Sequence, residues 1–343
     1  MDIGKKNPIP ACAFDTLFTK NVPHILERIF FSLDYESFKI CVKVCNTWHG
    51  LLTSESFLVK AKCRFPDIER DEHLLWLYSK HGNKKEVGKL LSILILDVNC
   101  SRDGSTPLHE AAMQGHKHVA QLLLDSGADH ERENHWGRTP LLISVSNRHK
   151  DVVQMLLDNG ADPDRAHKQD GGTPLHRAAR KGYEDVMNLL LERGADPHKS
   201  NNFGATPLHW ASATGHKNMV QMLLRRGTDP NKASHSGETP LHWASQKGHK
   251  HVVQILLDGG ARPEKTNKDG ENPLHQAEQH GRRDVFQVLY DFIHLNCSEC
   301  ATRNQFDGDG DQAQEGVQQR GGGGRGGLLR RFLCTDGGTC GIL

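Results

Sequence analysis

A repeat of 33 residues constrains this chain more than any other feature of its sequence. Thr-Pro pairs begin at residues 106, 139, 173, 206 and 239, with one extra residue before Thr173. A sixth copy, "GENPLHQAEQHG", has Asn272 in the place of the threonine. Self-similarity at such a period is typical of proteins in which each repeat contacts only its neighbours. The 343 residues therefore predict an elongated array, with room for a small additional domain, rather than one compact core.

Each repeat predicts a pair of helices and a projecting loop. In the first copy, Thr106 is an N-cap residue, and Pro107 suits a first helical position, where no N–H is required. Gly115 and Gly127 end the two helices, and the apolar residues between them follow helical spacing. One such pair cannot bury its apolar face alone, so the pairs are expected to stack into a solenoid. The predicted fold class is therefore dominated by α-helices, with a hairpin-like finger loop in each repeat.

The recurring Thr-Pro-Leu-His and Gly-Ala-Asp sequences resemble the ankyrin repeat. The resemblance implies six repeats over residues 103–294, at about 103–135, 136–169, 170–202, 203–235, 236–268 and 269–294. A degenerate capping repeat is expected at 71–102, which has the glycine and leucine spacing but no Thr-Pro. The second repeat has Leu142 in place of histidine and Arg148 in place of the turn glycine. A non-glycine residue in a left-handed turn costs about 1 kcal/mol, so this repeat is predicted to be the loosest.

Histidine recurs once per repeat at the start of the first helix. The residues are His109, His176, His209, His242 and His275. The resemblance implies that they join loop and helix by hydrogen bonds, and one repeat of separation is too far for them to share a metal ion. No nucleophile–base pair, phosphate-binding loop or paired carboxylates stand outside the repeat pattern. The sequence therefore predicts a protein without metal or cofactor that is not itself an enzyme.

Residues 19–64 match no repeat. Two apolar helical stripes over 22–52 are separated by Asp34 and Ser37, which are helix-start residues. Pro-x-Ile-Leu-x-x-Ile-Phe-x-x-Leu-Asp followed by Val-Cys-x-x-Trp resembles an F-box, similar to those of F-box proteins with WD40 propellers. In that family the module docks on the Skp adaptor, which links it to a cullin and a RING subunit. The resemblance implies these adaptor-binding residues: Pro23, Ile25, Leu26, Ile29, Leu33, Phe38, Val44, Cys45 and Trp48.

Target recognition is expected on the finger loops and on the exposed side of the first helices. The candidates are aromatic and charged residues at loop positions and at helix ends, namely Met113, Gln114, Trp136, Arg138, Arg180, Lys181, Phe203, Glu238, Gln246 and Lys247. Exposed aromatic residues flanked by charges are suited to anchor an interface. The loop aromatics have the alternative of packing on a neighbouring finger. Trp210 and Trp243, which follow the histidine in consecutive repeats, are predicted to pack between repeats.

Residues 1–18 are expected to be a flexible N-terminus and 295–343 a disordered tail, because the tail is polar and glycine-rich. Its last four residues, Cys340-Gly341-Ile342-Leu343, resemble a prenylation box, although Gly341 is unusual in such a box. Cys334 is a weaker candidate for a second acyl chain. Modification of Cys340 would attach the protein peripherally to a membrane.

These features predict the substrate-recognition subunit of an SCF-type cullin-RING ubiquitin ligase. The alternative is an ankyrin-repeat scaffold or inhibitor, outside any ligase, whose N-terminal helices only cap the solenoid. A third interpretation keeps the ligase chemistry but makes the chain a bacterial effector that acts inside a host cell. The net charge of +1 gives no reason to expect nucleic acid as a partner. The lack of a secretory signal and of a long apolar stretch predicts a cytoplasmic or nuclear protein.

Overall fold

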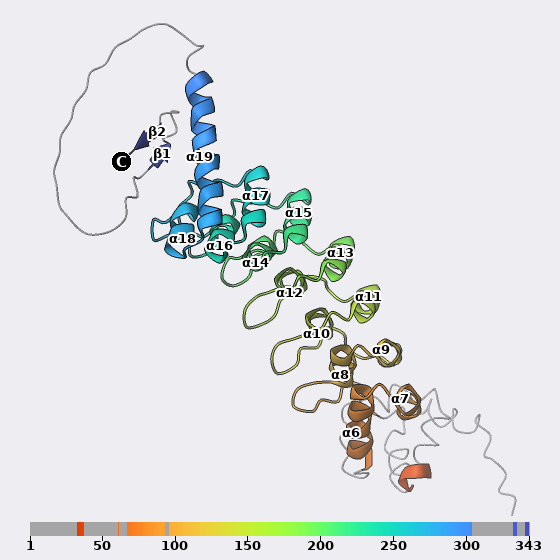
Figure 1. Cartoon of the computed structure of the whole chain (residues 1–343). Helices are drawn as coiled ribbons and strands as arrows, with labels where there is room; N and C mark the ends of the chain where they lie inside the picture. Colours follow the sequence, from red (N-terminus) through yellow and green to blue (C-terminus); the bar gives the residue numbers. More distant parts are fainter. Residues whose placement is uncertain are drawn as a thin grey trace, which may run out of the picture. The chain divides into compact units, whose positions relative to one another are not determined.

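The computed structural model describes residues 33–37, 61, 67–92, 96–303, 332–334 and 340–342 (Figure 1). Most of these residues are helical. The chain divides into two compact units, which are described separately. Unit 1 comprises Met1–Pro174 and Asn188–Ala195, and unit 2 comprises Leu175–Met187 and Asp196–Leu343.

The described part of unit 1 contains three complete helix pairs. They are α6 (Asp67–Lys80) with α7 (Lys84–Leu91), α8 (Pro107–Gln114) with α9 (Lys117–Asp125), and α10 (Pro140–Ser146) with α11 (Lys150–Asp158). The first helices α6, α8 and α10 contact one another in order, as do the second helices α7, α9 and α11. Finger loops project from the first-helix row, on the side away from the second helices (Figure 1).

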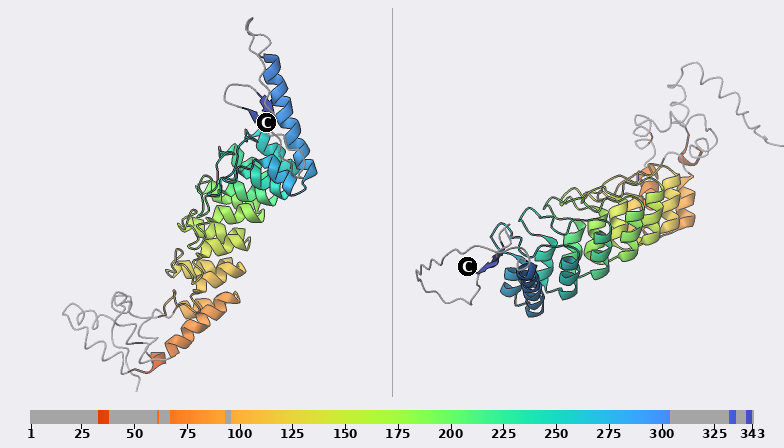
Figure 2. Two further views of the ribbon diagram at one scale, coloured as in Figure 1. Left: turned by 90° about the vertical axis from the view of Figure 1, so that its left-hand side faces the viewer. Right: turned by 90° about the horizontal axis from the view of Figure 1, so that it is seen from above.

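Unit 2 repeats this arrangement. Its helices are α12 (Pro174–Lys181), α13 (Glu184–Glu192), α14 (Pro207–Thr214), α15 (Lys217–Arg225), α16 (Pro240–Lys247), α17 (Lys250–Asp258), α18 (Pro273–Gln279) and α19 (Arg283–Arg303). α12 begins and α13 ends with residues that belong to unit 1. α16 contacts α14 and α18, and α17 contacts α15 and α19, so first and second helices again form separate rows (Figure 2).

The first helices begin at the Thr-Pro pairs, as the sequence predicts. The Thr106 hydroxyl accepts a hydrogen bond from the backbone N–H of His109, and the His109 ring accepts one from the N–H of Thr106. This reciprocal capping box satisfies donors that a helix start would leave unpaired. Asn272 caps α18 in the same way in the last repeat.

The core lies between the two helices of each pair and between neighbouring pairs. In the first repeat, Leu108, Ala111 and Ala112 of α8 and Leu123 of α9 are fully buried. Alanine at two consecutive positions keeps the first helix thin enough for its neighbours to approach closely. Each buried leucine contributes about 2 kcal/mol, so most of the stability comes from contacts between adjacent helices.

Left-handed turns end the first helices. Gly115, Gly215 and Gly248 have φ angles of 77°, 78° and 82°. In the second repeat the same turn is made by Arg148, with a φ of 61°. A side chain in this conformation is strained by about 1–2 kcal/mol, and the weakness of that repeat remains a prediction.

The finger loops close with hairpin-like backbone hydrogen bonds. The N–H of Asn134 donates to the carbonyl of Arg138 at 3.0 Å, and that of Asn201 to Ala205 at 2.9 Å. The predicted fold class, a solenoid of helix pairs with hairpin-like fingers, is therefore confirmed.

The structure differs in two places from the disordered tail predicted for 295–343. α19 continues through Arg303, because neither glycine nor proline interrupts the sequence before Gly308. Two short strands, β1 (Phe332–Cys334) and β2 (Cys340–Ile342), pair in antiparallel fashion. The sequence between them contains Asp336-Gly337, a pair that favours a tight turn.

Candidate protein-binding surface

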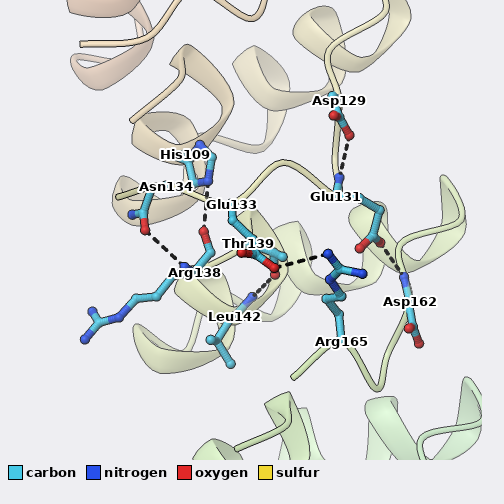
Figure 3. Close-up of polar contacts among 10 residues, drawn as sticks. All are labelled: His109, Asp129, Glu131, Glu133, Asn134, Arg138, Thr139, Leu142, Asp162 and Arg165. Carbon is cyan, nitrogen blue, oxygen red and sulfur yellow. Dashed lines mark hydrogen bonds and ion pairs between the residues drawn. The ribbon is translucent and has the colours of Figure 1, made fainter. Parts of the chain in front are cut away.

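Histidine side chains attach four of the fingers to the preceding first helix. Nε2 of His109 donates to the carbonyl of Arg138 at 3.0 Å (Figure 3). Equivalent bonds join His176 to Ala205, His209 to Glu238 and His242 to Glu271, at 3.0, 3.2 and 3.1 Å. The acceptor is in each case the residue before the next helix cap. These bonds fix the fingers, and with them the residues that the fingers display.

These bonds require neutral histidine. Because Nδ1 of His109 accepts the N–H of Thr106, the ring proton must lie on Nε2. Burial lowers the pKa of His109 to about 4, although hydrogen bonds to backbone carbonyls oppose the shift. Burial likewise lowers the pKa of His209 to about 4 and lowers that of His242. The rings are structural parts of the surface, and ligand contact falls to other residues.

A second set of side chains reaches back to the preceding repeat. Nε2 of His116 donates to the carbonyl of Lys80 at 3.1 Å, and that of His149 to Met113 at 2.9 Å. In unit 2, His249 bonds to Ala213, and Arg282 takes the same role toward Gln246. These bonds hold the ends of the first helices, where several of the predicted contact residues lie.

Trp76 performs the histidine role in the capping pair, a function that the sequence reasoning missed. Its Nε1 donates to the carbonyl of Ser105 at 3.0 Å, again the residue before the helix cap. The spacing was the available signal, because Trp76 precedes Thr106 by 30 residues, just as His109 precedes Thr139 by 30.

The two predicted finger aromatics are exposed. The Trp136 side chain is 46% exposed and that of Phe203 60%. The Trp136 ring lies 3.4 Å from the ring of His135, its neighbour in the same finger. The backbone beneath them is fixed, because the side-chain oxygen of Asn134 accepts the N–H groups of Trp136 and Arg138. Asn201 does the same for Phe203 and Ala205.

Polar contacts also join neighbouring fingers in unit 1 to each other. A carboxylate oxygen of Glu131 accepts the N–H of Asp162 at 2.7 Å, and Arg165 pairs with Glu133 at 3.1 Å (Figure 3). The exposed Arg138 side chain extends away from the other side chains drawn, so its carbonyl serves the fold while its guanidinium faces solvent.

The predicted residues at helix ends fall into two groups. Gln114, Arg180, Lys181 and Lys247 are exposed, whereas Met113 and Gln246 are half-buried. Glu238 is also half-buried, and its carboxylate accepts hydrogen bonds from the Trp243 indole at 2.8 Å and the Ser236 hydroxyl at 3.1 Å. Glu238 is therefore engaged within the surface and less available to a partner than its sequence position suggested.

Trp210 and Trp243 pack against each other, as predicted. Their ring centroids are 5.4 Å apart with the rings nearly perpendicular, an arrangement that aromatic pairs favour. The guanidinium of Arg180 lies 5.1 Å from the Trp210 ring centroid. The structure thus brings together the predicted residues Arg180 and Glu238 through two tryptophans that were not among the predicted contact residues.

Most of the predicted adaptor-binding residues lie outside the described part of the chain. Of the predicted adaptor-binding residues only Leu33 is described, and it is half-buried. Pro23, Ile25, Leu26, Ile29, Phe38, Val44, Cys45 and Trp48 lie outside the described residues. Cys334 ends β1, Cys340 begins β2, and the two are register partners in the backbone pairing.

In the described part of the chain, no group of three or more His, Cys, Asp and Glu residues is placed to hold a metal ion. None of the described helices combines the length and apolar character needed to cross a bilayer.

Comparison with known families identifies the class of the protein. A family model described as "Ankyrin repeats (3 copies)" matches residues 57–134, 74–167, 129–201, 164–234 and 227–299. The matches together span more than half of the chain, which therefore belongs to the ankyrin repeat family. The comparison with curated proteins gave no match. Ankyrin repeats bind protein partners in general, which makes the surface described above a candidate protein-binding surface.

Proposed function

We propose that this chain is the substrate-recognition subunit of an SCF-type cullin-RING ubiquitin ligase. The F-box over 19–64 docks on the Skp adaptor, and the ankyrin surface holds the target protein. The chain itself catalyses nothing in this proposal. It raises the effective concentration of the target near the ubiquitin-carrying enzyme, and proximity of this kind accelerates a reaction without any new catalytic group.

The observation that carries the proposal is the Leu-Asp sequence at 33–34, followed by Val-Cys-x-x-Trp. Residues 33–37 of this sequence are described, and Asp34 lies at the start of a helix, which is the role that the sequence predicts for it. The carboxylate of Asp34 accepts hydrogen bonds from the N–H and the hydroxyl of Ser37, at 2.8 and 2.9 Å. These bonds lower the pKa of Asp34, and they cap the helical residues Tyr35–Ser37.

A second candidate function rests on a different contact. The Tyr35 hydroxyl donates to the carboxylate of Asp71, a buried residue of α6, at 2.9 Å. Burial, and then the bond to Asp71, raises the pKa of Tyr35 far above its usual value. Docking of this segment on the capping helix is what a non-ligase scaffold or inhibitor with an N-terminal cap would need.

The deciding experiment measures binding of the intact chain to purified Skp adaptor. We expect a submicromolar Kd for the wild-type chain and at least tenfold weaker binding for Leu33→Ala and for Trp48→Ala. Phe203→Ala is the matched control, because it truncates an apolar side chain on a finger and is expected to leave adaptor binding unchanged. Circular dichroism verifies that each variant keeps its helices.

Tyr35→Phe separates the two candidates further. It removes the bond to Asp71 without touching a predicted adaptor-binding residue. A folded wild-type chain that fails to bind the adaptor, together with a loss of stability in Tyr35→Phe, would leave the scaffold as the function.

The proposal includes attachment of the protein to a membrane through the residues that resemble a prenylation box, Cys340–Leu343. Prenylation of Cys340, supported by acylation of Cys334, would restrict the ligase to targets at one membrane surface. Mass spectrometry of the protein from eukaryotic cells tests it, with Cys340→Ser as the control. An unmodified wild-type C-terminus would exclude this role and leave a cytoplasmic or nuclear location.

A further inference from the structure

The first helices of unit 2 carry an unusual set of side chains. Over α12, α14 and α16 the sequences "PLHRAARK", "PLHWASAT" and "PLHWASQK" contain four basic residues, two tryptophans and no acidic residue. We call these six residues the basic-aromatic patch: Arg177, Arg180, Lys181, Trp210, Trp243 and Lys247.

Side-chain contacts hold the centre of the patch in place. The Trp243 indole donates to the carboxylate of Glu238 at 2.8 Å, which fixes one ring. The Trp210 ring meets it edge to face at 5.4 Å, and Arg180 lies over Trp210 at 5.1 Å. Both tryptophans remain half-buried and Arg180 is exposed, so parts of all three face solvent. Binding there would order few additional side chains, which lowers its entropic cost.

The repeat itself does not require tryptophan at this position. The residue after the first-helix histidine position is Glu110, Ile143, Arg177 or Gln276 in other repeats. The helix pairs that carry Glu110 and Gln276 form with the same capping box as those that carry Trp210 and Trp243. The tryptophans therefore serve more than the packing of the array.

Two lysines of the patch have charge that is available to a partner. Lys181 and Lys247 are exposed, and within the described part of the chain neither has an ion-pair partner. Glu238, the acidic residue beside the tryptophans, already accepts hydrogen bonds from Trp243 and Ser236. The patch thus presents positive charge around an aromatic centre.

We propose that the basic-aromatic patch binds an acidic segment of the target protein that also carries an apolar or aromatic side chain. Carboxylates of the segment pair with Arg180 and Lys181, and the apolar side chain lies on Trp210. Stacking orients the Arg180 guanidinium before binding, so its planar donors are ready for a carboxylate. The inference rests on the proposed function, since it names the chemistry of the target that the repeats hold.

Selection from a random peptide library on the intact chain tests the inference. We expect the enriched peptides to be rich in Asp and Glu and to contain an aromatic or large aliphatic residue. Fluorescence anisotropy then gives the Kd of one such peptide. Trp210→Gln copies Gln276, which the last repeat has at the same position, so the fold should tolerate it. We expect this variant and Arg180→Glu each to weaken binding about tenfold or more.

Two controls show whether the patch itself and its positive charge cause the binding. Tyr290→Gln removes an exposed aromatic side chain from α19, outside the candidate surface, and should leave the affinity unchanged. A peptide whose acidic residues are replaced by lysine should bind Arg180→Glu better than it binds the wild-type chain, because the charge complementarity is restored.

Several results would overturn the inference. They are enrichment of basic or uncharged peptides, no enrichment at all, unchanged affinity in both patch variants, or tighter binding of a single-stranded DNA oligonucleotide at the patch. The adaptor measurement is independent of these results. Adaptor binding without acidic-peptide binding refutes the patch alone, whereas acidic-peptide binding without adaptor binding refutes the ligase role and leaves the patch intact.

Discussion

The first helices of unit 1 and unit 2 share one scheme of attachment, but α8 and α10 differ in side-chain chemistry from α12, α14 and α16. In unit 1, α8 and α10 carry a single acidic residue, Glu110, and neither a basic residue nor a tryptophan. In unit 2, α12, α14 and α16 carry the basic-aromatic patch. The helix caps and finger attachments use buried Thr, Pro and His side chains in both units. The difference shows that the exposed side of the first helix can vary freely while the attachments stay the same.

The units also differ in regularity. Unit 1 has Trp76 and Leu142 at histidine positions and Arg148 at a glycine position, whereas unit 2 has histidine at each first-helix position. Unit 1 therefore relies less on buried neutral histidine and contains a strained turn. Four predictions follow this contrast from the largest expected effect to the smallest.

Acid should loosen unit 2 more than unit 1. Folding lowers the pKa of His109 in unit 1, and of His209 and His242 in unit 2, so the unfolded chain binds more protons. This stabilisation is complete above pH 6.5 and is lost as the pH falls toward about 4 for His109 and His209. The loss is roughly 3 kcal/mol for each of these two residues. Hydrogen exchange of backbone amides at neutral and at acidic pH, corrected for intrinsic rates, measures it.

His209→Leu, which copies Leu142, is the matched variant for that experiment. It should be less stable at neutral pH and less sensitive to acid. Faster acid-induced exchange in unit 1 than in unit 2 would contradict the prediction.

Moving the strained turn into unit 2 should destabilise it. Gly215 has a φ of 78°, and a Cβ there would lie 2.7 Å from the His249 ring. Gly215→Arg therefore combines backbone strain with a clash, and we expect a loss of about 2–3 kcal/mol in the free energy of unfolding. Urea denaturation measures the loss. Gly227→Arg is the control, because its φ of 80° brings strain but no atom lies within 4 Å of the added Cβ. Equal losses in the two variants would show that the clash is relieved.

The reverse change should strengthen unit 1. Arg148→Gly removes a side chain from a left-handed position with a φ of 61°. The expected gain in the free energy of unfolding is about 1 kcal/mol, reduced by the greater freedom of glycine in the unfolded chain. Thermal and urea denaturation measure this gain. A variant less stable than the wild-type chain would mean that the Arg148 side chain makes a contact worth more than the strain.

The smallest effect is expected at Glu110. The residue is 5% exposed, and burial raises the pKa of its carboxyl, an effect that Lys80 opposes. The folded state therefore binds this proton more tightly than the unfolded state, so ionisation destabilises the fold as the pH rises. Glu110→Gln should give a small gain in stability at neutral pH that vanishes in acid. A loss at neutral pH would indicate that the carboxylate is stabilised by a partner.

Sequence alone predicted the parts of the fold that depend on fixed spacing. The cap at Thr106 and the histidine at His109 lie three residues apart, and the finger carbonyl that His109 bonds belongs to Arg138 in the next repeat. Such contacts recur with the period, so one copy predicts the others. Trp76 escaped notice because its repeat lacks Thr-Pro and its side chain differs in type from histidine.

The candidate surface was only partly predictable. The exposure of Trp136 and Phe203 follows from their place in the fingers, since the array does not cover them. The contacts that join Arg180, Trp210, Trp243 and Glu238 depend on side-chain rotamers in three repeats, and the periodicity does not specify these rotamers. The extension of α19 escaped prediction because the repeat pattern ends before the helix does.

The acceptors of the finger bonds have a consequence for how such a chain can change in length. Each histidine bonds a main-chain carbonyl, and the residues that supply it are as different as Arg138, Ala205 and Glu238. A carbonyl is present whatever the side chain, so a segment of one period that is duplicated or deleted brings along, or rejoins, its own points of attachment. Gain or loss of whole repeats in register therefore leaves no bond at the junction without a partner, whereas an insertion of a few residues between histidine and finger would.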